Sequence, residues 1–424
     1  MHTHLATALS LAVLAATRAR AQASPAADTS LARLTAEAVA ANPSLEASRA
    51  MARAAAARVR PAGALPDPML SAGVMDLTLP RFAFRESDFT EVDLELSQEF
   101  PWPGTLGART QAAGAEARAR AADTGARRRE IAVRVAELYY RLRYVVTARR
   151  TLRSQRELLS TAVEISLSRY STASAPQSDP LQARVAVARL DAEDADLVQQ
   201  EAALRAQLRA IRNVRHPEIL AMEPIRPEMA PQGVHAALLA ADSTPDLLPA
   251  HPRLLARQAA LEAAERSVRV EQLGARPDFT ITTRYGARPL GSDFFSAFVG
   301  LRVPLWAGRK QHHLAEAARA DADAARAALA AEQAALDAEL RGALADIRSG
   351  ETRLRLLTAQ VIPASEAMVE AVLRSYRVGQ APFLNVLAAE DSLYRARLDA
   401  AMVAAEHLTH LVMLEQLLLR EEAS

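Results

Sequence analysis

The feature that most constrains this chain of 424 residues is an internal duplication. Self-similarity at a fixed spacing is the signature of a repeated structural unit. We therefore expect a first repeat over residues 24–212, a proline-rich connector over 213–249, a second repeat over 250–420 and a tail over 421–424. Four landmarks recur in the same order about 200 residues apart: Asn42-Pro43 and His251-Pro252, Leu65-Pro66-Asp67 and Arg276-Pro277-Asp278, Phe100-Pro101 and Val303-Pro304, Tyr170 with Ala175-Pro176 and Tyr376 with Ala381-Pro382.

The sequence of each repeat predicts long helices. No proline occurs between Pro103 and Pro176, and the segment from Thr105 to Tyr170 is rich in Ala, Arg, Glu and Leu. At 1.5 Å per residue, this segment would form a helix of roughly 100 Å. In the second repeat, Pro363 is expected to kink the equivalent helix. Apolar residues recur at the seven-residue spacing of a coiled coil at Ile131, Leu138, Val145, Leu152 and Leu159, and again at Leu340, Ile347, Leu354, Val361 and Met368.

Composition agrees with long helices and excludes several classes of function. Half of the residues are apolar but only 4% are aromatic, so Ala, Leu and Val supply most of the hydrophobicity. The 51 basic and 50 acidic residues nearly cancel, unlike the charge of a nucleic-acid-binding face. The chain has no cysteine, which excludes disulfides, thiol catalysis and cysteine-based zinc sites.

Two segments in each repeat alternate between apolar and polar side chains and predict β-strands. They cover about 68–79, 90–100, 278–286 and 294–303. Strands of about 9–11 residues can cross a bilayer when they are tilted. The alternation also fits a soluble antiparallel sheet with one face on a core, so the pattern alone leaves both possibilities open.

Four strands cannot close into a barrel by themselves. Open edges in hydrocarbon would leave backbone N–H and C=O groups unsatisfied, at several kcal/mol each. In a membrane, the strands would therefore have to join strands from other copies of the chain. Glu91, Asp93, Glu95 and Arg284 alternate with apolar residues, and we expect these charged side chains to face a water-filled lumen.

The N-terminus predicts export. Residues Leu5 to Ala16 form a short apolar run followed by small residues, and we expect a signal peptide over residues 1–23. No later stretch reaches the ~20 uninterrupted apolar residues of a membrane helix. A membrane crossing would therefore have to be made by strands.

The best-defined local motif of the chain is Tyr376-Arg377-Val378-Gly379 followed by Phe383-Leu384-Asn385-Val386-Leu387. With this motif and the arrangement of helices and strands, the chain resembles the outer membrane efflux proteins, the TolC family, over nearly all of its mature length. A second stretch, Leu96-Ser97-Gln98-Glu99-Phe100-Pro101-Trp102-Pro103-Gly104 with Arg109, is similar to the strand-to-helix corner of family members that serve heavy-metal exporters.

The resemblance implies a mainly helical fold with long antiparallel coiled coils and four β-strands per chain. It implies a homotrimer in which one twelve-stranded β-barrel continues into a periplasmic helical tunnel. The channel would lie in outer-membrane lipid of a Gram-negative bacterium, with a long periplasmic portion. It would dock on a periplasmic adaptor (membrane fusion protein) and an inner-membrane pump of the RND type, and would passively conduct heavy-metal cations or drugs.

The resemblance also assigns residues by position. A periplasmic gate is expected where Tyr376 meets Asp179 of the first-half hairpin. The family's nearby arginine falls on Ala381, and its two constriction acids fall on Asn385 and Ala388. Glu390 and Asp391 are nearby acids that could supply a displaced acidic ring. The adaptor is expected to contact the hairpin tips at Ala175, Pro176, Val378, Gly379, Ala381 and Pro382.

A second function stays open at the level of sequence: a periplasmic adaptor or structural coiled-coil protein whose strands form a small soluble domain. We expect no enzyme, because no Gly-rich phosphate loop, nucleophile elbow or paired-histidine zinc motif occurs. The pairs His312-His313 and His407 with His410 lack a partnered carboxylate at useful spacing, so we also expect no metal and no cofactor. The near-neutral charge predicts no nucleic-acid partner.

Overall fold

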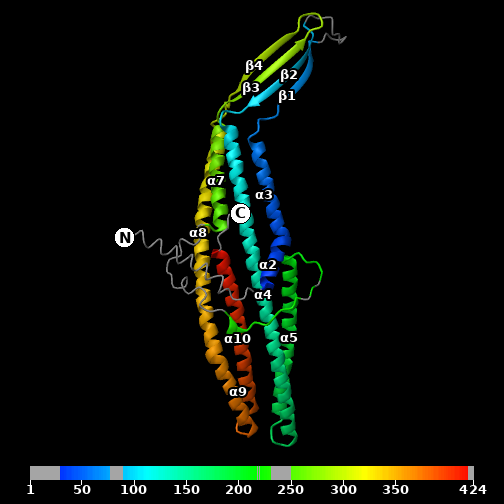
Figure 1. Cartoon of the computed structure of the whole chain (residues 1–424), viewed down its shortest axis with the longest axis vertical. Helices are drawn as coiled ribbons and strands as arrows, with labels where there is room; N and C mark the ends of the chain where they lie inside the picture. Colours follow the sequence, from blue (N-terminus) through cyan, green and yellow to red (C-terminus); the bar gives the residue numbers. More distant parts are fainter. Residues whose placement is uncertain (1–28, 77–88, 217, 219, 231–249, 419–424) are drawn as a thin grey trace, which may run out of the picture. The chain divides into compact units, whose positions relative to one another are not determined.

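The computed structural model describes residues 29–76, 89–216, 218, 220–230 and 250–418 (Figure 1). The predicted signal peptide at 1–23, most of the connector after 230 and the tail at 421–424 lie outside the described residues. The same holds for residues 77–79 of the first predicted strand.

The chain forms two compact units, each built from segments of both halves. Of the described residues, the helical unit contains those within 29–45, 127–230 and 337–418, and the sheet unit contains those within 46–126 and 250–336. The order helix, two strands, long helix and shorter helix occurs twice along the chain. The exact boundaries of the two repeats stay a prediction.

The sheet unit contains one antiparallel sheet of four strands in the order β1-β2-β3-β4 (Figure 1). These strands are β1 (Met69–Met75), β2 (Glu91–Phe100), β3 (Asp278–Ala287) and β4 (Phe294–Arg302). The alternating segments of the sequence therefore do form four strands. The central pair joins the two halves of the chain, because β2 pairs with β3 in a register that sets Glu95 opposite Arg284.

Alternation gives the sheet two chemically different faces. Because successive side chains of a strand point to opposite sides, the register places most of the apolar side chains of the four strands on one face, whereas Met69, Met75, Phe294 and Phe298 fall on the other. This apolar face is exposed, with 78% of Val299 and 48% of Leu94 accessible to solvent. It comprises Leu70, Val74, Val92, Leu94, Leu96, Ile281, Tyr285, Phe295, Val299 and Leu301.

Helices α3 (Pro43–Ala62) and α7 (Pro252–Leu273) precede the two strand pairs. Each begins at one of the repeated landmarks. The Asn42 side chain accepts a hydrogen bond from Ser44 N–H at 2.9 Å, and the His251 ring accepts one from Arg253 N–H at 3.3 Å. A side-chain acceptor at the N-cap followed by proline in the first turn is the preferred start of a helix, which explains why this residue pair recurs.

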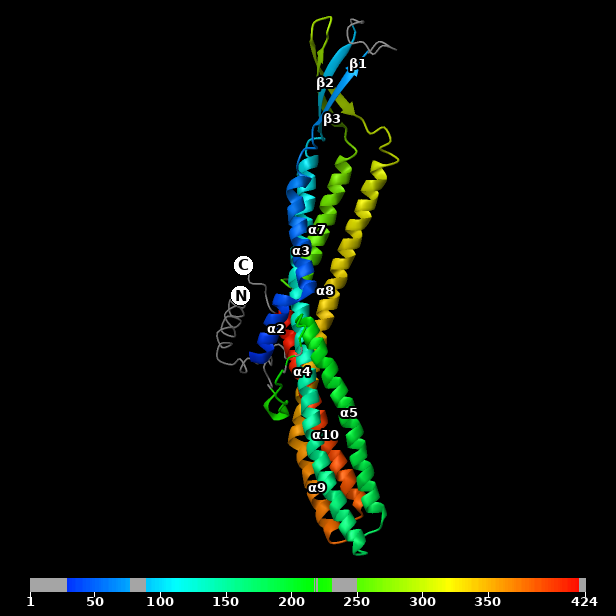
Figure 2. The same cartoon turned by 90° about the vertical axis from the view of Figure 1, so that its right-hand side faces the viewer.

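The helical unit is built on two hairpins of long helices (Figures 1 and 2). The first joins α4 (Thr105–Ser171) to α5 (Ser178–Ile211), and the second joins α9 (Ile362–Arg377) to α10 (Phe383–Leu418). Helix α4 contains 67 residues and passes through both compact units, as α8 (Gln311–Leu356) also does. The short helix α2 (Thr29–Ala41) completes the unit.

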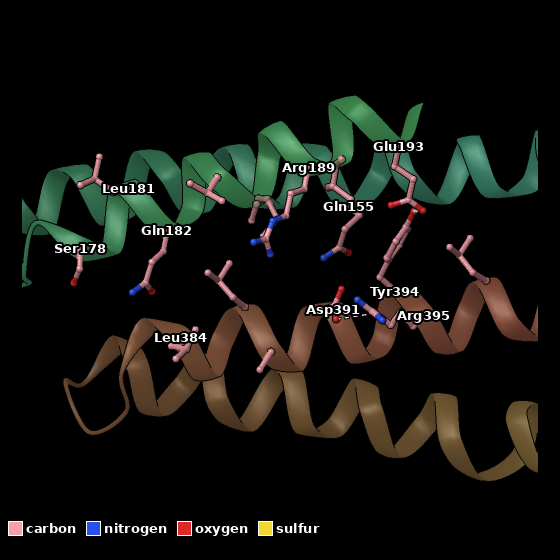
Figure 3. Close-up of a pocket in the computed structure, with 17 residues that line it drawn as sticks. Gln155, Ser178, Leu181, Gln182, Arg189, Glu193, Leu384, Asp391, Tyr394 and Arg395 are labelled. Atoms are coloured by element: carbon pink, nitrogen blue, oxygen red, sulfur yellow. Dashed lines mark hydrogen bonds and ion pairs between the residues drawn. The ribbon is translucent and has the colours of Figure 1, made fainter. Parts of the chain in front are cut away.

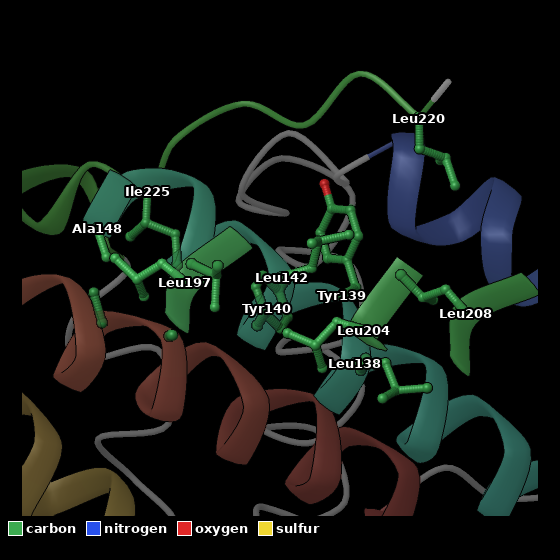
Figure 4. Close-up of a cluster of buried hydrophobic side chains, with 14 of the residues drawn as sticks. Leu138, Tyr139, Tyr140, Leu142, Ala148, Leu197, Leu204, Leu208, Leu220 and Ile225 are labelled. Carbon is green, nitrogen blue, oxygen red and sulfur yellow. The ribbon is translucent and has the colours of Figure 1, made fainter. Parts of the chain in front are cut away.

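The first predicted heptad seam is confirmed by burial. Ile131, Leu138, Val145, Leu152 and Leu159 are all at least nine-tenths buried. On α5, buried residues also recur every seven positions, at Ala183, Leu190, Leu197 and Leu204. Figure 4 shows part of the cluster in which side chains of these helices meet. This packing is the coiled-coil arrangement that the seven-residue spacing predicts.

The second predicted seam is correct only as far as Leu354. Leu340, Ile347 and Leu354 are fully buried, but Val361 and Met368 are 41% and 42% exposed. A π-helical turn, η2 (Leu357–Val361), follows Leu354 and ends two residues before Pro363. Proline cannot donate the usual helical hydrogen bond, and a π-turn inserts one residue that rotates all later side chains. The buried face therefore continues at Ser365 and Tyr376.

The described part of the connector packs against the helical unit. Leu220 and Ile225 join its core (Figure 4), and Ile225 N–H donates to Thr147 Oγ1 at 2.8 Å. A short 3₁₀ turn, η1 (Pro227–Met229), follows. These contacts tie an otherwise irregular, proline-rich segment to α4.

One helical run in the described part of the chain, Gln311–Arg377, contains an 18-residue stretch that is apolar enough to cross a membrane by length and composition alone, with a mean hydropathy of 1.3. Only 11% of that stretch is buried within the chain.

Candidate functional site

The tips of the two hairpins end their first helices in the same way. Ser174 N–H donates to Arg169 C=O at 2.8 Å, and Gln380 N–H donates to Ser375 C=O at 2.9 Å. Such a bond across six residues requires a left-handed residue just before its donor. Gly379 takes this conformation in the second hairpin with φ +79°, whereas Ala173 takes it in the first with φ +55°.

The structure places all the predicted adaptor-contacting residues at these two tips. Val378 is 68% exposed, Pro176, Gly379 and Pro382 are exposed, and Ala175 and Ala381 are half-buried. The tips therefore present small and apolar surface to solvent. Their role in contacting an adaptor stays a prediction.

The structure brings Tyr376 and Asp179 into one buried cluster between the two hairpins. Tyr376 is 6% exposed and Asp179 is 7% exposed. The Tyr376 ring contacts Phe383 with ring centroids 5.3 Å apart, and Ala183 and Val386 complete the cluster. In contrast, Tyr170, the first-half counterpart of Tyr376, is 42% exposed.

Arg169 makes the polar contacts to Tyr376. Its guanidinium lies over the Tyr376 ring at 4.5 Å from the centroid, and Nη1 donates to Tyr376 C=O at 2.7 Å. A second nitrogen, Nη2, donates to Ser174 C=O at 3.3 Å. A charged donor to backbone carbonyls at helix ends makes a comparatively strong hydrogen bond, so Arg169 links the last turns of both helices.

The Tyr376 hydroxyl is buried without a hydrogen bond of normal geometry. Burial raises the pKa of Tyr376, the nearby Arg169 charge lowers it, and the Asp179 carboxylate raises it again, with a net upward shift. The tyrosine is therefore neutral at physiological pH. Its ring and its carbonyl, rather than its hydroxyl, carry the contact between the hairpins.

Arg169 is the site residue that the sequence interpretation missed. The family arginine was placed at Ala381, in the second hairpin, and no arginine was assigned in the first. Arg169 lies in the last turn of α4, where a cation interacts favourably with the helix dipole. This position was a readable signal for a helix-end contact, but its partner across the hairpins could be identified only from the tertiary structure.

The two positions expected to carry constriction acids are neutral and exposed. Asn385 and Ala388 are both exposed positions of α10. Glu390 cannot form a displaced ring, because it is 7% exposed and accepts a hydrogen bond from Gln155 Nε2 at 3.4 Å. Burial raises the pKa of Glu390, and the Gln155 hydrogen bond opposes this shift. Asp391 is exposed but pairs with Arg395 at 2.8 Å.

A groove of about 980 Å³ runs along the helical unit, with α4 and α5 on one side and α10 on the other (Figure 3). Leu181, Gln182 and Arg189 of α5 line it opposite Leu384 and Asp391 of α10. At one end of the groove, the Tyr394 hydroxyl donates to Glu193 Oε1 at 2.9 Å. The groove thus separates the two hairpins along the stretch next to the Tyr376 cluster, which includes Ala388.

The predicted lumen residues share the polar face of the sheet, where they form ion pairs. Arg284 lies 3.0 Å from Glu95 and 3.8 Å from Asp93, and Glu91 lies 3.4 Å from Arg288. Farther along, Arg302 makes a two-pronged contact with Glu99 at 2.6 and 2.8 Å. Because three arginines accompany the four acids, the negative charge of this face is largely compensated within the chain.

The histidines of the described residues do not form a cluster of metal ligands. Within the described residues, no group of three or more His, Cys, Asp or Glu side chains is placed to hold a metal ion. His313 contacts Glu316 at 2.9 Å, and His410 lies 3.8 Å from Asp346, each as a single pair.

The fold of this chain is similar to the folds of solved outer-membrane proteins and channels. The solved structure of CusC, described in terms of folding and transmembrane channel formation, superposes with a TM-score of 0.80 at 15% identity, covering 92% of both chains. VceC of Vibrio cholerae matches at TM-score 0.75 and 20% identity, covering 92% of this chain and 95% of that one. The CmeC outer membrane channel of Campylobacter jejuni matches at TM-score 0.75 and 14% identity, with 92% and 85% covered.

The sequence of the second half carries the corresponding family pattern. The profile described as outer membrane efflux protein matches residues 245–418. No match with a curated protein sequence was found. Together, the profile and the shared fold confirm the resemblance to the outer membrane efflux proteins, the TolC family.

Proposed function

We propose that three copies of this chain form the outer-membrane channel of a tripartite efflux system in a Gram-negative bacterium. The channel conducts substrate passively, without catalysis, from an inner-membrane pump and a periplasmic adaptor to the outside. The observation that supports this proposal is the four-stranded sheet, which combines one exposed apolar face with two outer strands, β1 and β4.

The physical argument starts at the sheet edges. Among the described residues, strands β1 and β4 each have a sheet neighbour on one side only, and unpaired edge groups in lipid would cost several kcal/mol each. Pairing β4 of one copy with β1 of the next satisfies both edges. Three copies supply twelve strands, the apolar face then meets lipid, and the ion-paired polar face lines the lumen. The alternative of a soluble adaptor leaves the apolar face without cover.

A cysteine cross-link tests the ring of strands. The chain has no cysteine of its own, so Ser71→Cys on β1 and Ser296→Cys on β4 introduce a clean pair on the polar face. Oxidation of the double variant in membranes should give covalent dimers and trimers on a non-reducing gel. Each single variant serves as the control and should stay monomeric. If the double variant gives no cross-link, and cysteines at neighbouring positions of β4 give none to β1 either, the proposed assembly is wrong.

We place the periplasmic gate at the Tyr376 cluster, with Arg169 as its main polar contact. The guanidinium joins the two hairpins through the Tyr376 ring and carbonyl, so widening the tunnel end requires this contact to separate. Arg169→Ala should raise the open-channel population roughly tenfold or more, since a hydrogen bond to a charged group is worth about 1.5–3 kcal/mol. Tyr376→Phe, which keeps the ring and the carbonyl, should change it little.

Single-channel conductance in planar bilayers measures this effect. Tyr170→Phe is the matched control, because Tyr170 occupies the equivalent position of the other hairpin and is exposed. Equal conductance for wild type, Arg169→Ala and Asp179→Ala would remove the gate from this cluster. The constriction should also show weak cation preference, because Asn385 and Ala388 are neutral.

For the substrate, we propose heavy-metal cations, with drugs as the alternative. The support is the sequence of the corner from Leu96 to Gly104 with Arg109. Deleting the protein should sensitise the host to cobalt, zinc, cadmium or copper. Sensitisation to drugs alone would contradict the metal assignment while leaving the channel intact.

A further inference from the structure

The corner between β4 and α8 displays an unusually exposed aromatic side chain. Leu305 is 80% exposed and Trp306 is 71% exposed. The backbone beneath them is ordered by consecutive turns, in which Ala307 N–H donates to Pro304 C=O at 3.0 Å and Arg309 N–H donates to Trp306 C=O at 2.9 Å. The tryptophan is therefore held outward by a defined backbone.

At the equivalent corner of the first half, between β2 and α4, the tryptophan is packed against other side chains. Trp102 stacks on Phe279 with centroids 5.8 Å apart, and Arg276 lies 5.9 Å from its ring. Its backbone N–H donates to Asp278 Oδ1 at 2.9 Å. One tryptophan is thus packed within the chain, whereas its counterpart has an exposed apolar surface.

Two further features surround Trp306. On its N-terminal side, Val303 is 53% exposed and continues the apolar face of the sheet through Leu301. On its C-terminal side, Arg309 and Lys310 are exposed, and neither takes part in an ion pair within the described part of the chain. Apolar surface, tryptophan and free cations therefore follow one another over eight residues, from Val303 to Lys310.

This order matches the chemistry of a bilayer surface. Tryptophan favours the boundary between acyl chains and headgroups, because its ring is apolar and its indole N–H needs a polar partner. Cations near an anionic leaflet gain about 1 kcal/mol each. We infer that residues Val303–Lys310 form a lipid-interface anchor, in which Leu305 and Trp306 enter the boundary of the periplasmic leaflet and Arg309 and Lys310 contact anionic phospholipid phosphates.

The anchor rests on the proposed membrane-spanning assembly and adds an asymmetry to it. Each chain contributes one anchor, from its second half only, because Trp102 is occupied by Phe279 and Arg276. Three anchors would then fix the height of the channel in the outer membrane at the point where strands give way to helices.

Tryptophan fluorescence tests the inference directly, because the chain has only two tryptophans. Wild type and Trp306→Phe are reconstituted in vesicles of phosphatidylcholine and phosphatidylglycerol, brominated either near the headgroup or near the chain end. The emission lost on Trp306→Phe belongs to Trp306. Lipids brominated near the headgroup should quench roughly half of it, and those brominated near the chain end should quench less. Trp102, which remains in the variant, should be quenched little.

The headgroup contact has its own measurement. With bromine only on phosphatidylglycerol, Trp306 should be quenched more than with bromine only on phosphatidylcholine. The double variant Arg309→Gln, Lys310→Gln should abolish this difference, whereas Arg276→Gln, at the packed corner, should preserve it. Equal quenching by both lipids in the wild type would overturn the headgroup part of the inference.

Failure of the anchor and failure of the channel can be told apart. Conductance in the same lipids together with a blue-shifted, unquenched Trp306 would mean that a second copy of the chain covers the corner, and the anchor is then wrong. Absence of conductance together with unquenched Trp306 and Trp102 would mean that the protein does not insert, and the proposed function then fails as well.

Discussion

Ala173 shows how single residues limit the stability of the hairpin tips. It adopts φ +55° at the end of α4, where the second hairpin uses Gly379 with φ +79°. A residue with a β-carbon is disfavoured in this left-handed region by roughly 1–2 kcal/mol. The two tips share the same hydrogen-bond pattern but differ in this local backbone strain.

Ala173→Gly should therefore stabilise the first tip by about 0.5–1 kcal/mol, since glycine removes the strain but adds entropy to the unfolded chain. Hydrogen exchange of the Thr172 and Ser174 amides should slow accordingly. The control Ala381→Gly, which lies outside the left-handed region, should give no slowing. Faster exchange in Ala173→Gly would show that the strain is not significant.

Glu390 gives the helical unit a pH dependence. Its folded-state pKa is raised by burial, so its contribution to stability is fully present below the unfolded value of about 4.3 and is lost as pH rises through the folded value. Glu390→Gln should raise the free energy of unfolding at neutral pH by about 1–2 kcal/mol, and this gain should vanish near pH 4. Urea denaturation in detergent across pH measures it, with exposed Glu370→Gln as the near-neutral control.

At the scale of elements, the β3–β4 hairpin depends on close packing between Gly286 and Phe294. The two residues face each other in the register, and a β-carbon on Gly286 would lie 2.1 Å from the Phe294 ring. Gly300, in the same hairpin, has room for a β-carbon, with Thr280 at 3.6 Å. The hairpin therefore contains one glycine whose β-carbon would displace a neighbouring ring and one glycine whose β-carbon would not.

Gly286→Ala should lower the melting temperature of the assembled protein, with a cost of about 1–3 kcal/mol for overpacking. Gly300→Ala should be nearly neutral. Combining Gly286→Ala with Phe294→Leu should restore part of the loss, because the smaller side chain can move aside. Heat-resistance of the oligomer on gels provides the measurement, and equal effects of the two alanines would contradict the packing argument.

At the scale of the whole molecule, the two faces of the sheet would decide how the proposed assembly contacts a membrane. Val299 lies on the apolar face and is 78% exposed, whereas Ser296 of the same strand lies on the polar face. Val299→Arg should strongly reduce membrane insertion, at about 2–4 kcal/mol per chain for an arginine near the bilayer midplane. Ser296→Arg should be tolerated. Fractionation of membranes after expression compares the two variants. Equal insertion of both would mean that the apolar face of the sheet does not contact lipid.

The sequence alone determined the elements: the four alternating segments, the heptad seam of α4 and the N-cap and proline pairs that start α3 and α7. These features depend on local periodicity and on residues near one another in the chain, so they can be read without coordinates. The order of these elements, together with the resemblance to a known family, predicted the fold that the chain shares with solved outer-membrane proteins. The same local rules failed after Leu354, because a π-turn beside Pro363 shifted the register by an amount that spacing alone does not show.

Only the tertiary structure decided which charged groups meet. Glu95 is opposite Arg284, Arg169 crosses to Tyr376 and Glu390 turns inward to Gln155, and each partner lies 189, 207 or 235 positions away in sequence. It also distinguished packed Trp102 from exposed Trp306 within the same repeated corner. The physical reason is that burial and pairing depend on what folds against a residue from a distance, whereas helix and strand periodicity is carried by the chain itself.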